Sequence, residues 1–146
     1  MQDLKREVPK SLIESIVDFC SRDNNIKAAF IFGSYGSKYQ NRSSDLDIAF
    51  LFDQPPEFMG QMELAAELEL MINESIEVDL INLNKADLVL QHEIVTEGLK
   101  VYSRNDIETA DYIEYVYKFG PDAKIFANKF TEDYMQGLKE ELNEDW

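Results

Sequence analysis

Cysteine, histidine and basic residues are all scarce in this chain. A single cysteine, Cys20, means that no internal disulfide framework can form. Its apolar neighbours predict a buried, unreactive thiol. The only histidine, His92, has no second histidine or cysteine nearby, so we expect no zinc site. Because 14 Lys and Arg stand against 29 Asp and Glu, we expect no direct binding of nucleic acid, which depends on basic residues that neutralise phosphates.

Long apolar runs are also missing. No stretch approaches the length of a membrane span, and the charged N-terminal segment lacks the apolar core of a signal peptide. We therefore expect a cytoplasmic protein with no membrane contact. The net charge of -15 suits cationic small molecules, basic protein partners or divalent metals, and equally suits solubility. What the chain does contain is 45% hydrophobic residues among 146, enough for one domain with a hydrophobic core.

Helical and strand periodicities alternate along the chain. A capping box from Ser11 to Glu14 predicts the start of a helix that ends near residues 23–25. Strands are predicted over 26–32, 46–52, 77–83 and 99–102, and helices over 57–75 and 86–97, the second with Gly98 as its C-cap. From residue 106 the pattern is helical, and Gly120-Pro121 is expected to divide it into two helices. This order predicts an α/β (α+β) fold with helices packed on a small mixed sheet.

The helical tail is rich in aromatic residues. We expect them to pack in the core, with an exposed stripe that docks a partner as the alternative. They are Tyr112, Tyr115, Tyr117, Phe119, Phe126, Phe130 and Tyr134.

Acidic residues interrupt two of the predicted strands. Side chains alternate along a strand, so Asp45 and Asp47 project on one side, while Leu46, Ile48 and the residues that continue their row point into the core. Asp79 lies between two apolar residues of the next strand. If the two strands are neighbours, three carboxylates meet on one surface. Such a cluster without His or Cys favours Mg²⁺ or Mn²⁺ over zinc and suits phosphoryl or nucleotidyl transfer with two metals.

A Gly-Ser pair ends the first predicted strand. Gly33 lets the backbone approach a phosphate closely, and the Ser34 hydroxyl and nearby N–H groups can donate hydrogen bonds to it. A lone D-x-D motif is more often a solvated strand end, and a lone Gly-Ser pair more often a loop. Their combination is the informative feature.

Gly33-Ser34, ten intervening residues and Asp45-Leu46-Asp47 resemble the G-S-x10-D-x-D signature of the polymerase-β-like nucleotidyltransferases. The strand VDLINLN, the segment HEIVTEGLKVYSRN and the aromatic tail further resemble the minimal nucleotidyltransferases, the antitoxins of HEPN/MNT toxin–antitoxin pairs. The resemblance implies a polymerase-β-like fold in a single domain over 1–146, with a catalytic core over 1–104 and a helical C-terminal extension over 105–146.

The resemblance also implies a chemistry. Asp45 and Asp47 would ligate two Mg²⁺ ions, Asp79 would complete the metal site and serve as general base, and Ser34 would hold the triphosphate of ATP. AMP would pass to a tyrosine of the cognate HEPN ribonuclease toxin and silence it. Many family members read Gly-Ser-x-Ala-Arg-Gly, whereas Gly36, Ser37 and Lys38 stand at the last three positions here. An Arg fork and a Lys point charge are not equivalent at phosphate. Lys38 or Arg42 would contact the nucleotide in place of the family's arginine, or both would be exposed surface residues.

Three other functions fit less of the sequence. A small-molecule nucleotidyltransferase acting on an aminoglycoside-like cation would suit the acidic surface, but little chain remains for a separate substrate domain. A non-catalytic antitoxin would neutralise its toxin by binding alone. RNA polymerisation is disfavoured, because no basic, aromatic-interleaved tract is present. His92 has no arginine at the spacing of a HEPN ribonuclease motif, so the toxin chemistry belongs to another chain.

Overall fold

The computed structural model describes residues 8–33, 45–72 and 76–144. Its elements follow in the order α1 (Lys10–Ser21), β1 (Ile26–Phe32), β2 (Leu46–Phe52), α2 (Phe58–Ile72), β3 (Val78–Asn82), α3 (Leu88–Glu97), β4 (Leu99–Ser103) and α4 (Asp106–Glu144). Every predicted strand is present, and β1 and β2 have the predicted bounds. In the part of the chain that the structure describes, no helix is long and apolar enough to cross a bilayer.

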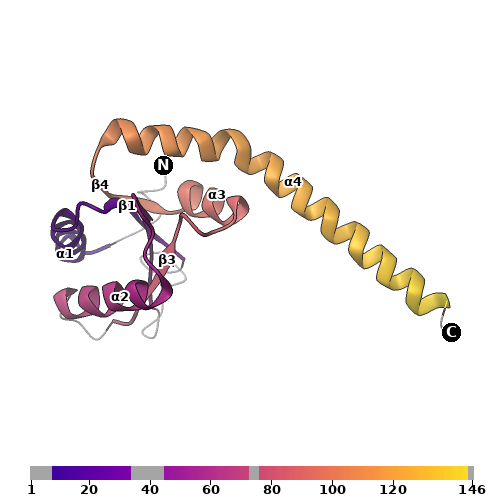
Figure 1. Ribbon diagram of the computed structural model, residues 1–146, viewed down its shortest axis with the longest axis horizontal. Helices are drawn as coiled ribbons and strands as arrows, with labels where there is room; N and C mark the ends of the chain where they lie inside the picture. The colour runs from indigo at the N-terminus through magenta and orange to yellow at the C-terminus, as the bar shows by residue number, and fades with distance from the viewer. Residues whose placement is uncertain (1–7, 34–44, 73–75, 145–146) are drawn as a thin grey trace.

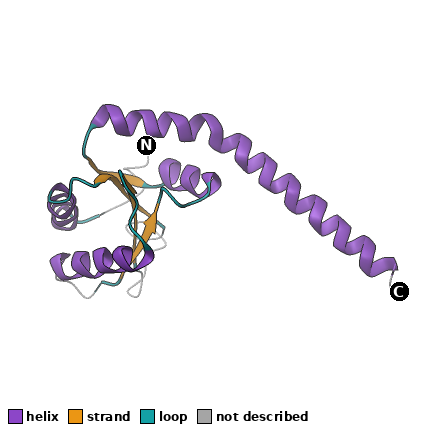
Figure 2. Cartoon of the chain, viewed as in Figure 1, coloured by secondary structure: helices purple, strands orange, loops and turns teal. Residues whose placement is uncertain are grey.

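The four strands form one mixed sheet in the order β3-β2-β1-β4. β1 pairs antiparallel with both β2 and β4, whereas β2 and β3 run parallel and are joined through α2. A parallel pair needs a crossover of this kind, because a tight turn can join only antiparallel strands. The predicted α+β architecture with a small mixed sheet is confirmed (Figures 1 and 2).

Both faces of the sheet are covered. One core cluster joins α1 and α2 to alternate residues of β2, namely Leu46, Ile48, Phe50 and Phe52. The intervening residues Ala49 and Leu51 belong to a second cluster, with Ile94 of α3 and Val116 of α4. The period-two alternation of the strand therefore gives each face its own helical layer. Cys20 is fully buried in the first cluster, as predicted.

The start of α1 differs from the prediction. The N-cap residue is Pro9, and no side chain caps the helix. Ser11 lies inside the first turn, where its carbonyl accepts a hydrogen bond from the Ser15 hydroxyl. The capping-box interpretation was therefore wrong. The N–H groups of Leu12 and Ile13 donate instead to the Pro9 carbonyl.

The C-terminal segment also differs, because α4 is one helix with Pro121 inside it. A proline costs a helix one backbone hydrogen bond, here the bond to the carbonyl of Tyr117. The backbone hydrogen bonds of the long helical stretches on both sides of Pro121 offset the loss of this one bond. The helix bends along its length (Figure 1), as helices with an internal proline do.

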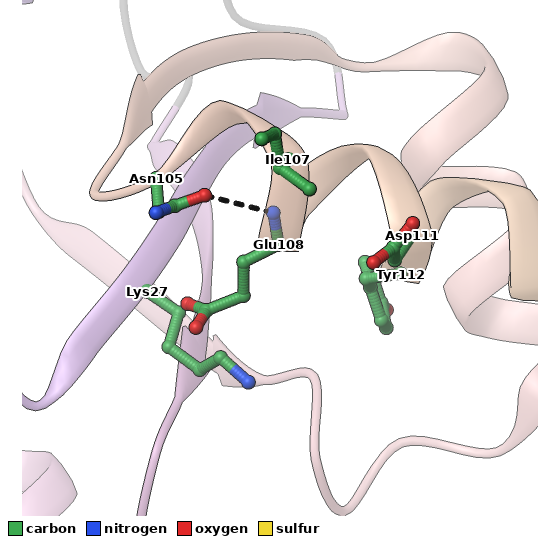
Figure 3. A pocket seen from close by; sticks show the side chains of 6 residues that line it. All are labelled: Lys27, Asn105, Ile107, Glu108, Asp111 and Tyr112. Atoms are coloured by element: carbon green, nitrogen blue, oxygen red, sulfur yellow. Dashed lines mark hydrogen bonds between the residues drawn. The ribbon is translucent and has the colours of Figure 1, made fainter.

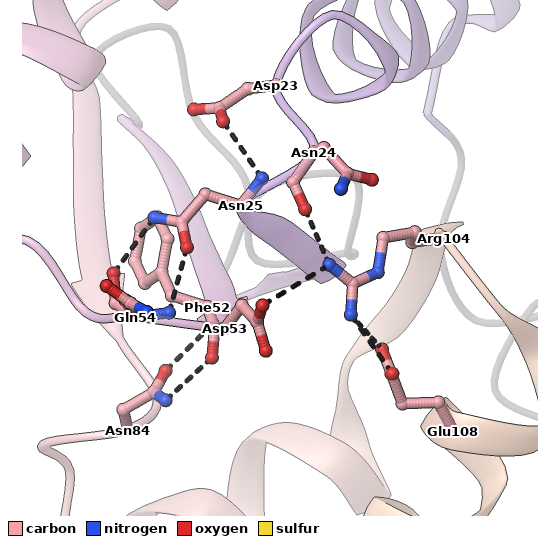
Figure 4. A network of polar contacts seen from close by, with 9 residues as sticks. All are labelled: Asp23, Asn24, Asn25, Phe52, Asp53, Gln54, Asn84, Arg104 and Glu108. Carbon is pink, nitrogen blue, oxygen red and sulfur yellow. Dashed lines mark hydrogen bonds and ion pairs between the residues drawn. The ribbon is translucent and has the colours of Figure 1, made fainter.

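A polar network fixes the start of α4 to the sheet (Figure 4). The Arg104 guanidinium donates to both carboxylate oxygens of Glu108, at 2.8 and 3.0 Å, and to the backbone carbonyl of Asn24. Its Nη1 also lies 3.9 Å from the Asp53 carboxylate. Arg104 thus joins the loop before β1, the end of β2 and the first turn of α4. The i, i+4 spacing of Arg104 and Glu108 was a readable signal that the sequence analysis missed.

Most of the tail aromatics lie outside the core, so the expectation of core packing was wrong for them. Tyr112 is the exception: it packs in the second cluster, and its hydroxyl donates to Gln91 of α3 at 2.8 Å. The exposed ones are Tyr115, Tyr117, Phe119, Phe126, Phe130 and Tyr134. Phe126, Phe130 and Tyr134 are exposed because the second half of α4 extends away from the sheet and the other helices (Figure 1), whereas Tyr115, Tyr117 and Phe119 lie on turns whose buried side is occupied by Val116 and Gly120.

Candidate active site

Two of the predicted acids lie side by side. β2 and β3 pair in parallel with Asp47 directly opposite Asp79, so the two Cα atoms are separated by about one strand spacing, ~4.8 Å. Residues in register on neighbouring strands project to the same face of the sheet. The prediction that Asp79 lies beside Asp47 on one surface is therefore confirmed.

The electrostatics of Asp47 reflect this crowding. Burial raises the pKa of Asp47 above its ordinary value, and the negative charge of Asp79, a hydrogen bond between the two side chains and the charge of Asp45 raise it further. Burial disfavours the charged form of Asp47 by itself, and the two neighbouring carboxylates disfavour it by repulsion. A cation bound between the carboxylates would remove the repulsion.

Asp45 stands one residue before β2 and is exposed. Its negative charge also raises the pKa of Asp47, but less than burial and the Asp79 side chain do. Among residues 8–33, 45–72 and 76–144, no three His, Cys, Asp or Glu side chains are gathered into a ready-made metal cluster. The closest association on this surface is thus the pair of Asp47 and Asp79.

The donor set fits a hard divalent cation. Carboxylate oxygens are the ligands that Mg²⁺ uses in proteins, usually one or two of them together with water and substrate phosphates. Asp47 and Asp79 supply oxygens at the start of two rigid, paired strands. Since Mg²⁺ retains several ligands from water and phosphate, two converging carboxylates are an adequate protein contribution.

Gly33 forms the third side of this site. It ends β1 with φ of +72°, and Phe32 beside it pairs with Asp47. A Cβ built on Gly33 would overlap the Asp47 carboxylate. Glycine is therefore required both for the left-handed backbone and for the lack of a side chain. The prediction that the glycine turn faces the acids is confirmed for Gly33. Ser34, Lys38 and Arg42 lie outside the described residues.

A pocket lies elsewhere on the molecule (Figure 3). It is an open hollow of about 600 Å³ beside the first turns of α4, lined by residues that include Lys27, Glu108 and Tyr112. Lys27 lies near the start of β1, whereas Phe32 beside the acids is at its end, roughly 17 Å away at the rise of a strand. This hollow is therefore separate from the acidic pair.

Comparison with known proteins agrees with this geometry. A family model described as "Polymerase beta, Nucleotidyltransferase" matches residues 14–107, a range that includes Gly33, Asp45, Asp47 and Asp79. The chain is 35% identical over 83 residues to the protein adenylyltransferase MntA of Shewanella oneidensis. That alignment covers 56% of this chain and 58% of MntA, so less than two thirds of MntA is matched.

Solved structures give the same fold. A chain in the crystal structure of a toxin–antitoxin with AMP-PNP superposes with a TM-score of 0.70 at 23% identity, over 84% of this chain and 98% of that one. A chain in the complex of tri-AMPylated Shewanella oneidensis HEPN toxin with MNT antitoxin superposes with a TM-score of 0.68 at 22% identity, over 92% and 99%. At these identities the likeness establishes the shared fold.

Proposed function

Because the chain belongs to the polymerase-beta nucleotidyltransferase family, we propose that it is a Mg²⁺-dependent protein adenylyltransferase that acts as an antitoxin. Its substrate is ATP, and its target is a tyrosine of a HEPN-type ribonuclease toxin, which the added AMP neutralises. The observation that carries this proposal is the in-register pair of Asp47 and Asp79 beside Gly33. The matched relative MntA is a protein adenylyltransferase, and structures with this fold come from toxin–antitoxin complexes.

In the proposed reaction, the tyrosine oxygen forms a bond to the α-phosphorus of ATP. The bond from that phosphorus to the bridging oxygen breaks, and pyrophosphate leaves with the electron pair. Asp79, which is exposed, accepts the phenol proton. Asp45, Asp47 and Asp79 are the residues that would hold Mg²⁺, with two ions expected from the resemblance. Bound Mg²⁺ supplies Lewis-acid stabilisation of the charge that develops on the phosphate oxygens.

The glycine turn has a separate role in this proposal. Without a side chain, Gly33 lets the backbone come into close contact with the Asp47 carboxylate, and we assign the same turn to the close approach of a phosphate. We assign Ser34 to the triphosphate, and Lys38 or Arg42 to the contact that the family's arginine makes. These assignments rest on the resemblance of the Gly-Ser motif and its spacing to Asp45.

The test is a transfer assay on the intact proteins. The purified chain is incubated with ATP, Mg²⁺ and the purified product of the neighbouring open reading frame, and that product is then weighed by intact-mass spectrometry. We expect a gain of one or more AMP units that requires Mg²⁺. A stable complex without any gain of mass would show instead that the protein is a non-catalytic antitoxin that acts by binding.

A matched pair of variants ties the activity to the site. Asp47→Asn removes one carboxylate of the acidic pair, whereas Glu63→Gln makes the same chemical change at an exposed position on α2. Transfer should disappear in the first variant and persist in the second. Equal transfer activity in the two variants would show that Asp47 is not part of the active site.

A further inference from the structure

The second half of α4 presents aromatic side chains to solvent. Beyond Gly120, where α4 packs on His92 of α3, the helix extends away from the rest of the molecule (Figures 1 and 2). Its described side-chain hydrogen bonds there, from Thr131 to the Ala127 carbonyl and between Gln136 and Glu140, stay within the helix. The domain itself therefore leaves this face of α4 uncovered.

Five of the aromatics lie along one face of α4 and are called the aromatic stripe below. Phe126, Phe130 and Tyr134 are spaced by four residues, and Phe126 follows Phe119 by seven, about two turns. Tyr115 packs against Phe119, with ring centroids 5.0 Å apart. The stripe consists of Tyr115, Phe119, Phe126, Phe130 and Tyr134, with exposed fractions of 53%, 42%, 71%, 64% and 61%.

The stripe is large enough to be part of an interface. Aromatic side chains bury ~150–250 Å² each, so at these exposures five of them leave roughly 500 Å² of aromatic surface open to water. This is comparable to the largest apolar patch on a typical monomer, which is often functional. It is more than half of the ~800 Å² that one partner contributes to a standard interface.

Acidic residues follow one edge of the stripe. Asp122, Asp133 and Glu140 are spaced by 11 and 7 residues, close to whole numbers of turns, so they line up beside the aromatics. Lys124 and Lys139 fall on the opposite side of the helix by the same count. Lys129 lies on the acidic edge, and the Lys118 ammonium lies 5.5 Å from the Phe119 ring centroid, so three acids against two lysines leave this edge net negative. Pairing of two copies through this face would bring together two chains of net charge -15 and their acidic edges, and like charges disfavour such pairing. A basic partner is favoured instead.

We propose that the aromatic stripe is the docking surface for the AMP-accepting protein, which receives it in an apolar groove bordered by Lys and Arg. This inference rests on the proposed function and adds to it the place where the protein substrate is held. The stripe and the acidic pair lie on different elements: the stripe on α4, and the acids on β2 and β3. Docking and chemistry should therefore be separable by mutation: the stripe sets affinity for the protein substrate, and the acids set the rate of transfer.

A double variant of the stripe tests this separation. Phe126→Ala/Phe130→Ala removes two exposed rings four residues apart, and Asn128→Ala/Glu132→Ala changes two exposed side chains with the same spacing on the opposite face. Both pairs lie on the protruding part of α4, so both variants should melt as the wild type does. Circular dichroism checks that the helix remains.

Binding and steady-state transfer are then measured with the purified product of the neighbouring open reading frame. For Phe126→Ala/Phe130→Ala we expect Kd and KM to rise about tenfold or more, as for the loss of central aromatic contacts, with kcat unchanged. The control variant should match the wild type. Kd and KM within twofold of the wild type in the stripe variant would overturn the proposal.

Two further outcomes separate this inference from the proposed function. If the wild type transfers no AMP but binds the target, and the stripe variant loses that binding, the enzymatic function fails while the docking surface stands. If the wild type sediments as a dimer that the stripe variant converts to monomer without weaker target binding, the stripe is a self-interface. That result would overturn the docking proposal and leave the catalytic one intact.

Discussion

Gly33 lies so close to the carboxylate of Asp47 that any side chain on residue 33 would overlap it. The contact brings the end of β1 against the start of β2. The left-handed backbone of Gly33, at φ +72°, is a second reason why glycine is needed there. One residue thus fixes the distance between the turn and the acidic pair.

We expect Gly33→Ala to damage both stability and activity. A side chain in the left-handed region costs about 1–2 kcal/mol, and the new Cβ must displace Asp47. The free energy of unfolding should fall by at least about that amount, and transfer should be lost even at temperatures where the variant is folded. Urea denaturation and the transfer assay measure the two effects.

Gly137→Ala is the matched control for that substitution. Gly137 lies in α4, and a Cβ there would meet nothing within 4 Å. Alanine should stabilise the helix by about 0.5–1 kcal/mol and leave kcat for transfer unchanged. If the two glycine variants behaved alike, the close contact at Gly33 would have no role in the site.

Replacement of Asp47 by asparagine should separate stability from activity. Its pKa is raised in the folded protein, so the folded state holds the proton more tightly than the unfolded state. The contribution of Asp47 to stability is therefore full below the ordinary aspartate pKa and is lost as the pH rises through the raised value. At neutral pH without metal, Asp47→Asn should raise the melting temperature relative to the wild type.

The same variant should lower transfer by about 100-fold or more, the order lost with one group that stabilises transition-state charge. Thermal melts at pH 4 and pH 7 and the transfer assay give the two measurements. The stability gain should shrink toward pH 4, where the wild-type carboxyl takes up its proton. A gain that stayed constant with pH would show that Asp47 repulsion is not its origin.

Gly120 and His92 should be energetically coupled. A Cβ on Gly120 would meet the His92 ring at 2.6–2.7 Å, so Gly120→Ala overpacks the contact of α3 with α4 and should destabilise by about 1–3 kcal/mol. His92→Ala opens that space, and the double variant should recover part of the loss. A double-mutant cycle of unfolding free energies measures the coupling. Strictly additive losses would contradict the contact.

Cys20 should resist thiol reagents in the folded protein. Burial, with a smaller effect of the nearby Asp23 charge, raises the pKa of the thiol to about 12, and the thiolate is the reactive form. At pH 8 we expect no labelling by iodoacetamide until the protein is unfolded in urea. Rapid labelling under native conditions would mean that the α1 face of the core opens readily.

Local sequence signals predicted the strands and the acids well. β1 and β2 are short runs of branched and aromatic residues bounded by Gly33 and by Asp53, so their limits could be read directly. Strand alternation predicts a shared face for Asp45 and Asp47, but Asp45 stands one residue before β2, so that part stays a prediction. The partnership of Asp47 with Asp79 was conditional on strand order, which depends on how α2 crosses over the sheet.

Features decided by tertiary packing were less predictable. Pro121 is a strong local signal for a break, yet α4 continues through it. Gly120, directly before the proline, is buried against His92 of α3, an interaction between segments far apart in the sequence. The exposure of Phe126 and Phe130 also depends on tertiary structure, because the outer part of α4 has no neighbouring element to pack against among the described residues (Figure 1). A helical period cannot tell whether the apolar side of a helix meets its own domain or extends beyond it.

Because α4 is one continuous helix, its outer turns lie far from the sheet. With 39 residues at 1.5 Å each, its contour is roughly 58 Å, nearly twice the width of a small domain. Arg104 and Glu108 attach the first turn of this helix to the sheet, and its outer turns extend away from the domain (Figure 1). An acceptor that contacted both the outer turns of α4 and the acids would have to bridge two separate elements of the protein, which suits a protein acceptor better than an aminoglycoside.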